Sequence, residues 1–454
     1  MSKTIPARPR AVLVGIQLPG VTEEEHASDL AELGRLVTTL GYEPVVTLIQ
    51  KRGGLGSGTV LGSGKLKELA DLTGGPGVIA SGAAKVTSKA REKWEEEEEA
   101  EEEEEESAPV EAPEGARPTV VIVDQELSPS QLRNLEKATA AQVLDRTGVI
   151  VDIFHRHARS REARMQVEIA RLNYLAPRLR ESTGRSERQQ GRGSGDSAVE
   201  LDRRKIRDRL AELKAGLAAV QAEQDNRRYA RKDQLRVALV GYTNAGKSSL
   251  MRALTGSEVL VADQLFATLD TTVRALQPET RPRILVSDTV GFIQKLPHDL
   301  VASFRSTLDE ALEAGLLLYV VDASDKTYEA QLEVTRSVLK EIGADVVPSL
   351  LLLNKADRLD AAAREALLVK HPDAIILSAH QPADVTALRQ RVIDYFEASM
   401  TEAELVIPYA RQGDLGEVYE TARVVSETFD ETGRRLVVRS LPAAIAKLVR
   451  TFAT

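Results

Sequence analysis

Short apolar runs alternate with longer amphipathic stretches over the first 158 residues. The apolar run at residues 10–15 predicts a strand. Residues 22–40 predict a helix that begins at Thr22, has Glu25 at the spacing of a capping box, and ends before Gly41. Further strands are predicted at residues 42–49, 77–79, 119–123, 143–144 and 149–154, and further helices at residues 66–72 and 128–139. Such alternation predicts an N-terminal α/β domain with a parallel sheet over residues 1–158.

Helical periodicity replaces this alternation between residues 159 and 234. Apolar side chains recur at spacings of four and three residues in two stretches, at Met165, Ile169, Leu172, Ala176 and Leu179 and again at Ile206, Leu210, Leu213, Leu217 and Val220. The residues between the two stretches, 181–197, are rich in Gly, Arg, Ser and Gln. We therefore expect an antiparallel helical hairpin with a flexible basic tip over residues 159–234.

Strands and helices alternate again from residue 235. Apolar runs at residues 236–240, 284–287, 316–321, 347–353 and 374–377 have the character of buried parallel strands, and helical segments lie between them. Residues 235–397 are therefore predicted to form a second α/β domain. A small C-terminal α+β domain is predicted for residues 398–454, with a helix at residues 415–426 and a strand at residues 434–438.

The formal net charge of −9 hides two segments of opposite sign. Eleven Glu residues lie between Glu95 and Glu106, and without them the net charge of the chain would be +2. Residues 155–236 carry 21 Lys and Arg against 12 Asp and Glu. Because like charges repel and nothing in this stretch can form a core, the acidic insert at residues 81–118 is predicted to be disordered or to be a frayed, exposed helix. The basic hairpin indicates a polyanionic partner such as RNA, with a solvated arginine face or a plain spacer as alternatives.

Composition also bounds the compartment. The chain contains no cysteine, which excludes disulfides and cysteine-based metal sites. None of its apolar runs has the length of a signal peptide or of a membrane span. We expect a cytoplasmic protein without a membrane span and, because nothing in the sequence demands a dimer, a monomer.

The strongest chemical signal is the stretch at residues 241–248, which reads G-Y-T-N-A-G-K-S between a predicted strand and a predicted helix. That is the setting of a phosphate-binding P-loop. Its glycines and the helix N-terminus direct backbone N–H groups at phosphate oxygens, Lys247 supplies a charge for the terminal phosphates, and the Ser248 hydroxyl can ligate Mg²⁺. The predicted phosphate-binding residues are Gly241, Tyr242, Thr243, Asn244, Ala245, Gly246, Lys247, Ser248 and Ser249.

A D-x-x-G motif follows the strand predicted at residues 284–287. Its members are Asp288, Thr289, Val290 and Gly291. Asp288 can hold Mg²⁺ through water, and the N–H of Gly291 can reach the γ-phosphate of a nucleotide. Lys247 and Gly291 are therefore the predicted catalytic residues.

Two later motifs favour guanine as the base. Asn354, Lys355 and Asp357 form an N-K-x-D motif after the strand predicted at residues 347–353. The Asp357 carboxylate can accept hydrogen bonds from N1–H and the 2-amino group of guanine, a donor pair that adenine lacks, and a buried acceptor left unpaired is costly. The next strand is followed by Ser378, Ala379 and His380, whose backbone N–H groups can contact guanine O6.

The segment between the P-loop helix and the D-x-x-G motif has the position of a switch I loop. Its predicted GTP-binding residues are Phe266, Ala267, Thr268, Leu269 and Asp270. One threonine here is expected to give its hydroxyl to Mg²⁺ and its N–H to the γ-phosphate. Thr268 is favoured, and Thr272 is the alternative. The predicted Mg²⁺ ligands are thus Ser248 and Thr268.

Together these motifs resemble a TRAFAC-type GTPase domain, and nearly all of the chain resembles the HflX family. Within the GTPase domain the resemblance rests on residues 266–272, 288–293 and 296–301, and outside it on residues 134–136, 144–147, 152–154, 166–168 and 173–179. The resemblance implies an N-terminal α/β domain with a helical hairpin, a GTPase domain and a small C-terminal domain. It implies hydrolysis of GTP to GDP and phosphate with Mg²⁺, binding to the large ribosomal subunit, and dissociation of stalled or stressed ribosomes.

The chain departs from the family in two places. The family's hairpin tip carries a Gly-rich stretch followed by G-P-G-E, whereas residues 191–198 here read G-R-G-S-G-D-S-A. The polyglutamate tract is an addition, which can tune binding electrostatically or be a neutral insertion.

Phe292 follows the D-x-x-G motif, where Ras-like enzymes place a glutamine that orients the attacking water. An apolar residue cannot orient water, so we expect slow intrinsic hydrolysis that a partner accelerates. His298 is a candidate base, although a structural role is favoured. Two other functions stay open: a signalling switch whose hairpin recruits a protein, and an RNA remodeller whose N-terminal domain binds adenine nucleotide.

Overall fold

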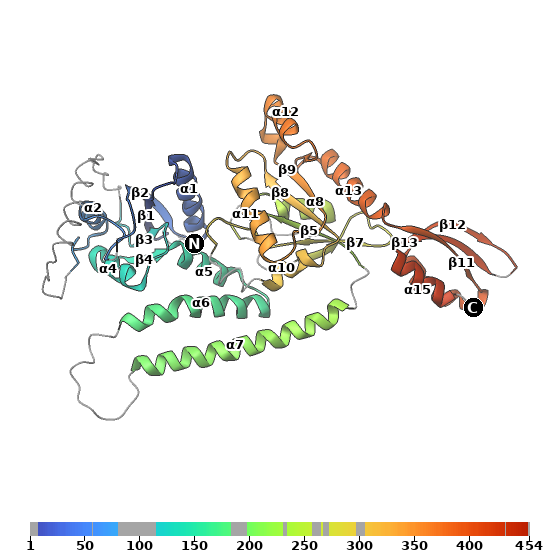
Figure 1. The fold of residues 1–454 in the computed structure, drawn as a ribbon, viewed down its shortest axis with the longest axis horizontal. Coiled ribbons are helices and arrows are strands. Elements are labelled where there is room, and N and C mark those ends of the chain that lie inside the picture. Colours follow the sequence, from blue (N-terminus) through green and yellow to red (C-terminus); the bar gives the residue numbers. More distant parts are fainter. Residues whose placement is uncertain are drawn as a thin grey trace, which may run out of the picture. The chain divides into compact units, whose positions relative to one another are not determined.

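A computed structural model describes residues 8–56, 58–79, 115–182, 198–229, 234–256, 265–266, 272–296, 305–431 and 433–452 (Figure 1). The chain divides into two compact units, Met1–Arg156 with Val167–Leu213, and His157–Gln166 with Lys214–Thr454. The mixed α/β class predicted from the sequence is confirmed. Most of the predicted acidic insert and the hairpin tip lie outside the described residues.

The first unit contains a parallel four-stranded sheet. Its strand order is β2-β1-β3-β4, and α1 packs on β1 and β2 while α4 packs on α2 and β4. The elements are β1 (Arg10–Gln17), α1 (Glu23–Thr39), β2 (Glu43–Lys51), α2 (Ser63–Thr73), β3 (Val120–Val123), α4 (Pro129–Thr139), β4 (Gln142–Asp145) and α5 (Arg146–His157). The predicted capping box of α1 is present, since Thr22 and Glu25 bond each other's backbone N–H groups.

Strands β1 and β3 are buried on both faces of the sheet, whereas the edge strand β2 buries only one. Val12, Val14 and Ile16 of β1 belong to the core that also holds side chains from α2 and α4. On the opposite face α1 packs closely at Gly15, where an added Cβ would lie 2.7 Å from the Leu30 side chain. The near-continuous apolar runs seen in the sequence follow from this double burial.

Two strand predictions in the first unit are wrong. Residues 149–154 are helical and belong to α5, which buries nearly all of its apolar side chains and so lacks a polar face. The N-cap of α5 is Asp145, whose Oδ1 accepts the Gly148 N–H at 2.7 Å. Residues 77–79 form no strand, because Gly77 has a φ of +70° and its N–H bonds the Ala138 carbonyl.

The predicted helical pair is present as α6 (Arg161–Ser182) and α7 (Ala198–Tyr229), which lie side by side in Figure 1. Glu168 of α6 forms an ion pair with Arg209 of α7 at 2.9 Å, and the earlier Met165 lies against the later Gly216, so the helices run antiparallel as expected. The apolar stripe of α7 includes the buried Leu213, while the flanking Glu212 and Lys214 are exposed.

The second unit carries a six-stranded sheet of order β10-β9-β8-β5-β7-β6, in which only β6 is antiparallel to its neighbour. Its strands are β5 (Leu235–Gly241), β6 (Thr272–Ala275), β7 (Ile284–Asp288), β8 (Leu316–Asp322), β9 (Ser349–Asn354) and β10 (Ile375–Ile376). Its helices are α8 (Lys247–Thr255), α10 (Arg305–Leu312), α11 (Tyr328–Glu341), η2 (Ala356–Arg358), α12 (Ala361–Lys370) and α13 (Pro382–Glu397).

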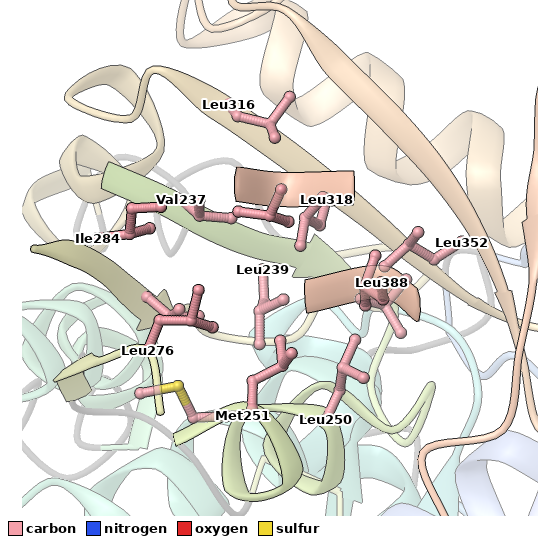
Figure 2. Packing of buried hydrophobic residues seen from close by; sticks show 14 of the residues in the cluster. Val237, Leu239, Leu250, Met251, Leu276, Ile284, Leu316, Leu318, Leu352 and Leu388 are labelled. Atoms are coloured by element: carbon pink, nitrogen blue, oxygen red, sulfur yellow. The ribbon is translucent and has the colours of Figure 1, made fainter. Parts of the chain in front are cut away.

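One apolar core fixes the helix that follows the P-loop. Figure 2 shows Leu250 and Met251 of α8 on the side of the sheet where the Leu239 side chain of β5 lies, and all three are fully buried. Leu388 of α13 closes the same core. Because the core holds α8 against β5, the loop between them has a defined path.

A smaller antiparallel sheet of order β11-β13-β12 ends the chain. Its elements are β11 (Thr401–Ile407), η3 (Tyr409–Asp414), α14 (Leu415–Thr421), β12 (Arg423–Phe429), β13 (Arg434–Ser440) and α15 (Pro442–Phe452). The helix predicted at residues 415–426 is too long: it ends at Thr421, and β12 follows because Val424 pairs with Val438 of β13. Strands β11 and β6 and helix α15 were not predicted from the sequence.

Candidate nucleotide-binding site

The loop from Gly241 to Lys247 is shaped by two glycines that no other residue could replace. Gly241 has a φ of +151°, and an added Cβ would lie 2.2 Å from the Val320 carbonyl oxygen. Gly246 has a φ of +96°, and an added Cβ would lie 2.3 Å from Nδ2 of Asn354. Tyr242, Thr243, Asn244 and Ala245 curl between them, and Ser249 lies in the first turn of α8.

Lys247 is folded back over this loop. Its Nζ donates hydrogen bonds to the carbonyl oxygens of Gly241 (3.0 Å) and Tyr242 (2.8 Å), and its side chain is buried. Burial lowers the pKa of Lys247 to about 8, and the nearby charge of Asp288 acts in the opposite direction. A buried ammonium at the N-terminus of a helix is well suited to an anionic ligand.

Ser248 and Asp288 place a hydroxyl and a carboxylate together at the start of α8 and the end of β7. The Ser248 Oγ donates to Asp288 Oδ2 at 2.7 Å. A hydroxyl and a carboxylate are hard oxygen ligands, so these two residues would suit Mg²⁺. Thr289 is fully buried and donates its hydroxyl to the Leu239 carbonyl at 2.7 Å, which makes it a structural anchor of the motif.

The D-x-x-G backbone pairs directly with the P-loop. Thr243 N–H donates to the Phe292 carbonyl at 2.8 Å, and Phe292 N–H donates to the Gly241 carbonyl at 3.1 Å. A Cβ added to Gly291 would lie within 3.0 Å of both Thr243 and Nζ of Lys247. Glycine is therefore needed at residue 291 because the backbone approaches the P-loop closely. Val290 and Phe292 are both buried.

Asn354 joins the P-loop to the two loops that follow β9 and β10. Its Nδ2 donates to the Ala245 carbonyl at 2.9 Å, and its Oδ1 accepts the Ala379 N–H at 3.1 Å. Lys355, with a φ of +61°, forms an ion pair with Asp322 at 2.7 Å. The three predicted loops therefore meet at the carboxyl ends of β5, β9 and β10, where ligands bind in open α/β sheets.

Asp357 is exposed, and its carboxylate is oriented from one side. The Ser378 hydroxyl donates to Asp357 Oδ1 at 2.5 Å, and this hydrogen bond is the main reason why the pKa of Asp357 is lowered. Ser378 is itself held by Asp384, which accepts its N–H at 2.8 Å. The N–H of His380 donates to the Ser378 hydroxyl. An ionised carboxylate with one face open can accept a paired set of donors.

Parts of the predicted switch regions fall outside the described residues. Ala267, Thr268, Leu269 and Asp270 lie there, as does His298. Phe266 is buried with a φ of +58°. Thr272, the alternative Mg²⁺ ligand, lies in β6 and is the register partner of Asp288 in β7.

Sequence reasoning missed two supporting carboxylates. Asp322 holds Lys355, and Asp384 holds Ser378. Both had a signal in the sequence: Asp322 ends an apolar strand run, and Asp384 lies just after Pro382 at a helix start. Neither belongs to a motif that contacts a nucleotide, so only the fold shows what they support.

A glycine-shaped phosphate loop, a hydroxyl–carboxylate pair and a tethered N-K-x-D loop define a P-loop GTPase domain. Models of three family regions match the chain: GTP-binding GTPase N-terminal at residues 27–80 and 104–155, GTP-binding GTPase Middle Region at residues 157–231, and 50S ribosome-binding GTPase at residues 236–355. The match to the middle region falls on the helical hairpin.

Relatives extend this match over the full length. GTPase HflX of Gluconacetobacter diazotrophicus is 69% identical over 453 residues, which cover 99% of each chain. GTPase HflX of Escherichia coli K12 is 35% identical, with 93% of this chain and 91% of that protein covered. The chain belongs to the HflX family of GTPases, and it is a GTP hydrolase.

A solved structure, the complex of SsGBP with GDP, is 22% identical with a TM-score of 0.46, and the match covers 85% of this chain and 98% of that chain.

Across the part of this chain that the structure describes, no helix combines the length and the apolar character needed to cross a membrane.

We predict that nucleotide affinity falls as the pH rises above about 8. The lowered pKa of Lys247 means that its ammonium is largely lost between roughly pH 7 and pH 9, so GDP should bind about tenfold more weakly at the higher pH. Titration with a fluorescent GDP analogue, below the pH at which guanine ionises, measures this. The Lys247→Arg variant keeps its charge and should show a flat profile. An equally steep profile in that variant would contradict the prediction.

We also predict that Asn354→Ala destabilises the GTPase domain by about 2 to 4 kcal/mol, because it leaves the buried Ala245 carbonyl and the partly buried Ala379 N–H unpaired. Urea unfolding of the full chain measures the free energy of unfolding. The transition of the GTPase domain is the one whose midpoint rises when GDP is added. Gln390→Ala removes an exposed hydrogen bond to Asp394 in α13 and should change stability by less than about 0.5 kcal/mol. Equal effects of the two variants would refute the bridging role.

Proposed function

We propose that this GTPase binds the large ribosomal subunit in its GTP state and dissociates stalled or stressed ribosomes. The observation that carries the proposal is the match of residues 236–355 to the model described as 50S ribosome-binding GTPase, on a chain whose residues 155–236 are strongly basic. The proposal includes four parts: an α/β domain over residues 1–158, a hairpin over 159–234, a GTPase domain over 235–397 and a C-terminal domain over 398–454.

The phosphate side of the proposed mechanism rests on the P-loop. Backbone N–H groups of Asn244 to Ser249 cradle the phosphates, and Lys247 turns from the carbonyls of Gly241 and Tyr242 toward the β- and γ-phosphates. Ser248 and Thr268 would hold Mg²⁺, with Asp288 acting through water. Bound Mg²⁺ neutralises charge that develops on the transferred phosphoryl group. The N–H of Gly291 donates to the γ-phosphate.

The base side of the mechanism selects guanine. Asp357 accepts hydrogen bonds from N1–H and the 2-amino group, and Ser378 holds its carboxylate in the required orientation. Guanine O6 would take the backbone N–H groups of Ala379 and His380 in place of their present acceptors, Asn354 Oδ1 and the Ser378 hydroxyl. Lys355, fixed by Asp322, covers the base.

In the proposed cycle, GTP hydrolysis is slow until the protein binds the ribosome. Phe292 is buried with 2% of its surface exposed, and it offers no side-chain donor or acceptor to orient water. Its backbone is held by the P-loop through Thr243 and Gly241. A ribosomal component would have to position the attacking water or reorder these loops, which couples GTP turnover to ribosome binding.

We predict that Asp357→Asn exchanges guanine for xanthine specificity. The amide oxygen can accept only one of the two hydrogen bonds that N1–H and the 2-amino group of guanine donate, so GTP affinity should fall about 100-fold. The amide NH₂ can donate to the C2 carbonyl of xanthine, so the affinity for xanthosine triphosphate should rise. Competition binding measures both. Asp360→Asn, which removes an equal charge at the N-cap of α12, should leave both affinities unchanged. Unaltered selectivity in the first variant would remove Asp357 from the base site.

We predict that large ribosomal subunits raise the GTPase turnover at least tenfold, whereas small subunits do not, because a water-positioning group supplied in trans is worth several kcal/mol. Phosphate release at saturating GTP measures this. Co-sedimentation with a non-hydrolysable GTP analogue tests binding, and sucrose-gradient profiles of whole ribosomes test dissociation. Equal turnover with and without subunits, together with no co-sedimentation, would refute the proposed function.

A further inference from the structure

A groove runs between α6 and α7 in the first unit. Its volume is about 390 Å³, within the range of small-ligand pockets. Helix α6 lines the groove with Asn173, Ala176 and Pro177. Helix α7 lines it with residues that lie about one turn apart on one face, namely Arg203, Ile206, Arg207 and Leu210. The groove thus has an apolar floor between polar walls.

The wall from α7 carries two cations that no described side chain of the hairpin neutralises. Among the described side chains neither Arg203 nor Arg207 forms an ion pair, and the buried Nε of Arg203 has no hydrogen-bond partner. Neighbouring cations are paired: Arg209 with Glu168 and Glu212, and Lys205 with Asp202. Two unpaired guanidinium groups above an apolar floor favour an anion that carries a flat apolar group.

The wall from α6 offers hydrogen-bonding groups to the opposite side of such a ligand. Asn173 has an amide that can donate and accept. Pro177 lies inside α6 and has no N–H, so it cannot donate the usual helical hydrogen bond to the Asn173 carbonyl. That carbonyl is available to a ribose 2′-hydroxyl or to an N–H on a base edge.

We propose that the α6–α7 groove binds one unstacked nucleotide of single-stranded RNA, with its phosphate on Arg203 and Arg207, its base on the apolar floor and its polar edge at Asn173. Each part of the nucleotide finds a matching wall, and RNA-binding proteins commonly read bases that are splayed out of a helix. A groove of this volume cannot take in a duplex. The inference deepens the proposed ribosome binding and rests on it for the source of the RNA.

The test uses the full chain and a fluorescent oligouridine. The Arg203→Ala/Arg207→Ala double variant should weaken binding at least about tenfold. The slope of log affinity against log salt concentration should become shallower by about 0.7 for each phosphate contact that is lost. Ala176→Trp fills the groove without changing the charge, and it should weaken binding to a similar extent. Arg204→Ala, which removes a neighbouring charge outside the groove, should weaken binding less than about threefold. Unchanged basal GTP turnover and thermal unfolding show that the variants are folded.

Several outcomes would overturn the inference. In the first, Arg204→Ala weakens oligouridine binding as much as substitution of either groove arginine does, and Ala176→Trp has no effect. That result would indicate diffuse electrostatic binding. Others are binding of duplex RNA as tightly as oligouridine, or tighter binding of a polyglutamate peptide that the groove variants abolish, which assigns the groove to an acidic peptide.

Co-sedimentation of the same variants with large subunits separates this inference from the proposed function. If the wild-type chain and the groove variants all bind large subunits to the same extent, the proposed function is supported and the groove site is refuted. If oligouridine binding depends on the groove but no chain binds subunits, the groove site stands and the proposed function falls.

Discussion

The GTP site depends on one buried amide. The side chain of Asn354 satisfies a carbonyl in the P-loop and an N–H in the loop after β10, so three loops from three parallel strands share one hydrogen-bonded centre. Because a buried polar group left unpaired is costly, the loops cannot move apart separately. The positions of Lys247, at the start of α8, and of Asp357, just after β9, are therefore set relative to each other by the fold.

A second buried polar centre organises the first unit. Asp145 ends β4, and its two oxygens accept hydrogen bonds from Leu127 N, Gly148 N, the Tyr174 hydroxyl and Arg178. Burial and the Asp145 charge raise the pKa of Tyr174, so its hydroxyl stays a donor. One carboxylate thus caps α5 and holds α6 against the sheet. That contact fixes the direction of the helix that lines the proposed nucleotide groove.

The errors of the sequence analysis have local physical causes. A run of β-branched residues at 149–154 favours a strand, but Asp145 caps a helix there and both sides of that helix are buried. The helix at 415 was predicted too long because nothing in its periodicity shows that Val424 pairs with Val438. Asp322 and Asp384 belong to no nucleotide-binding motif. Asp322 meets the Lys355 side chain only when β8 and β9 pair, and Asp384 meets the Ser378 N–H only when α13 packs beside the loop that follows β10.

The sequence by itself determined the class of the fold, the order of the GTPase motifs and the preference for guanine, because these depend on residue types at short, fixed spacings. Tertiary structure decided which groups meet. It alone shows why residues 241, 246 and 291 must be glycine, since the clashing atoms belong to Val320, Asn354 and Thr243. The groove between α6 and α7 also appears only in the folded chain, because its two arginines and Asn173 come from helices that fold back on each other.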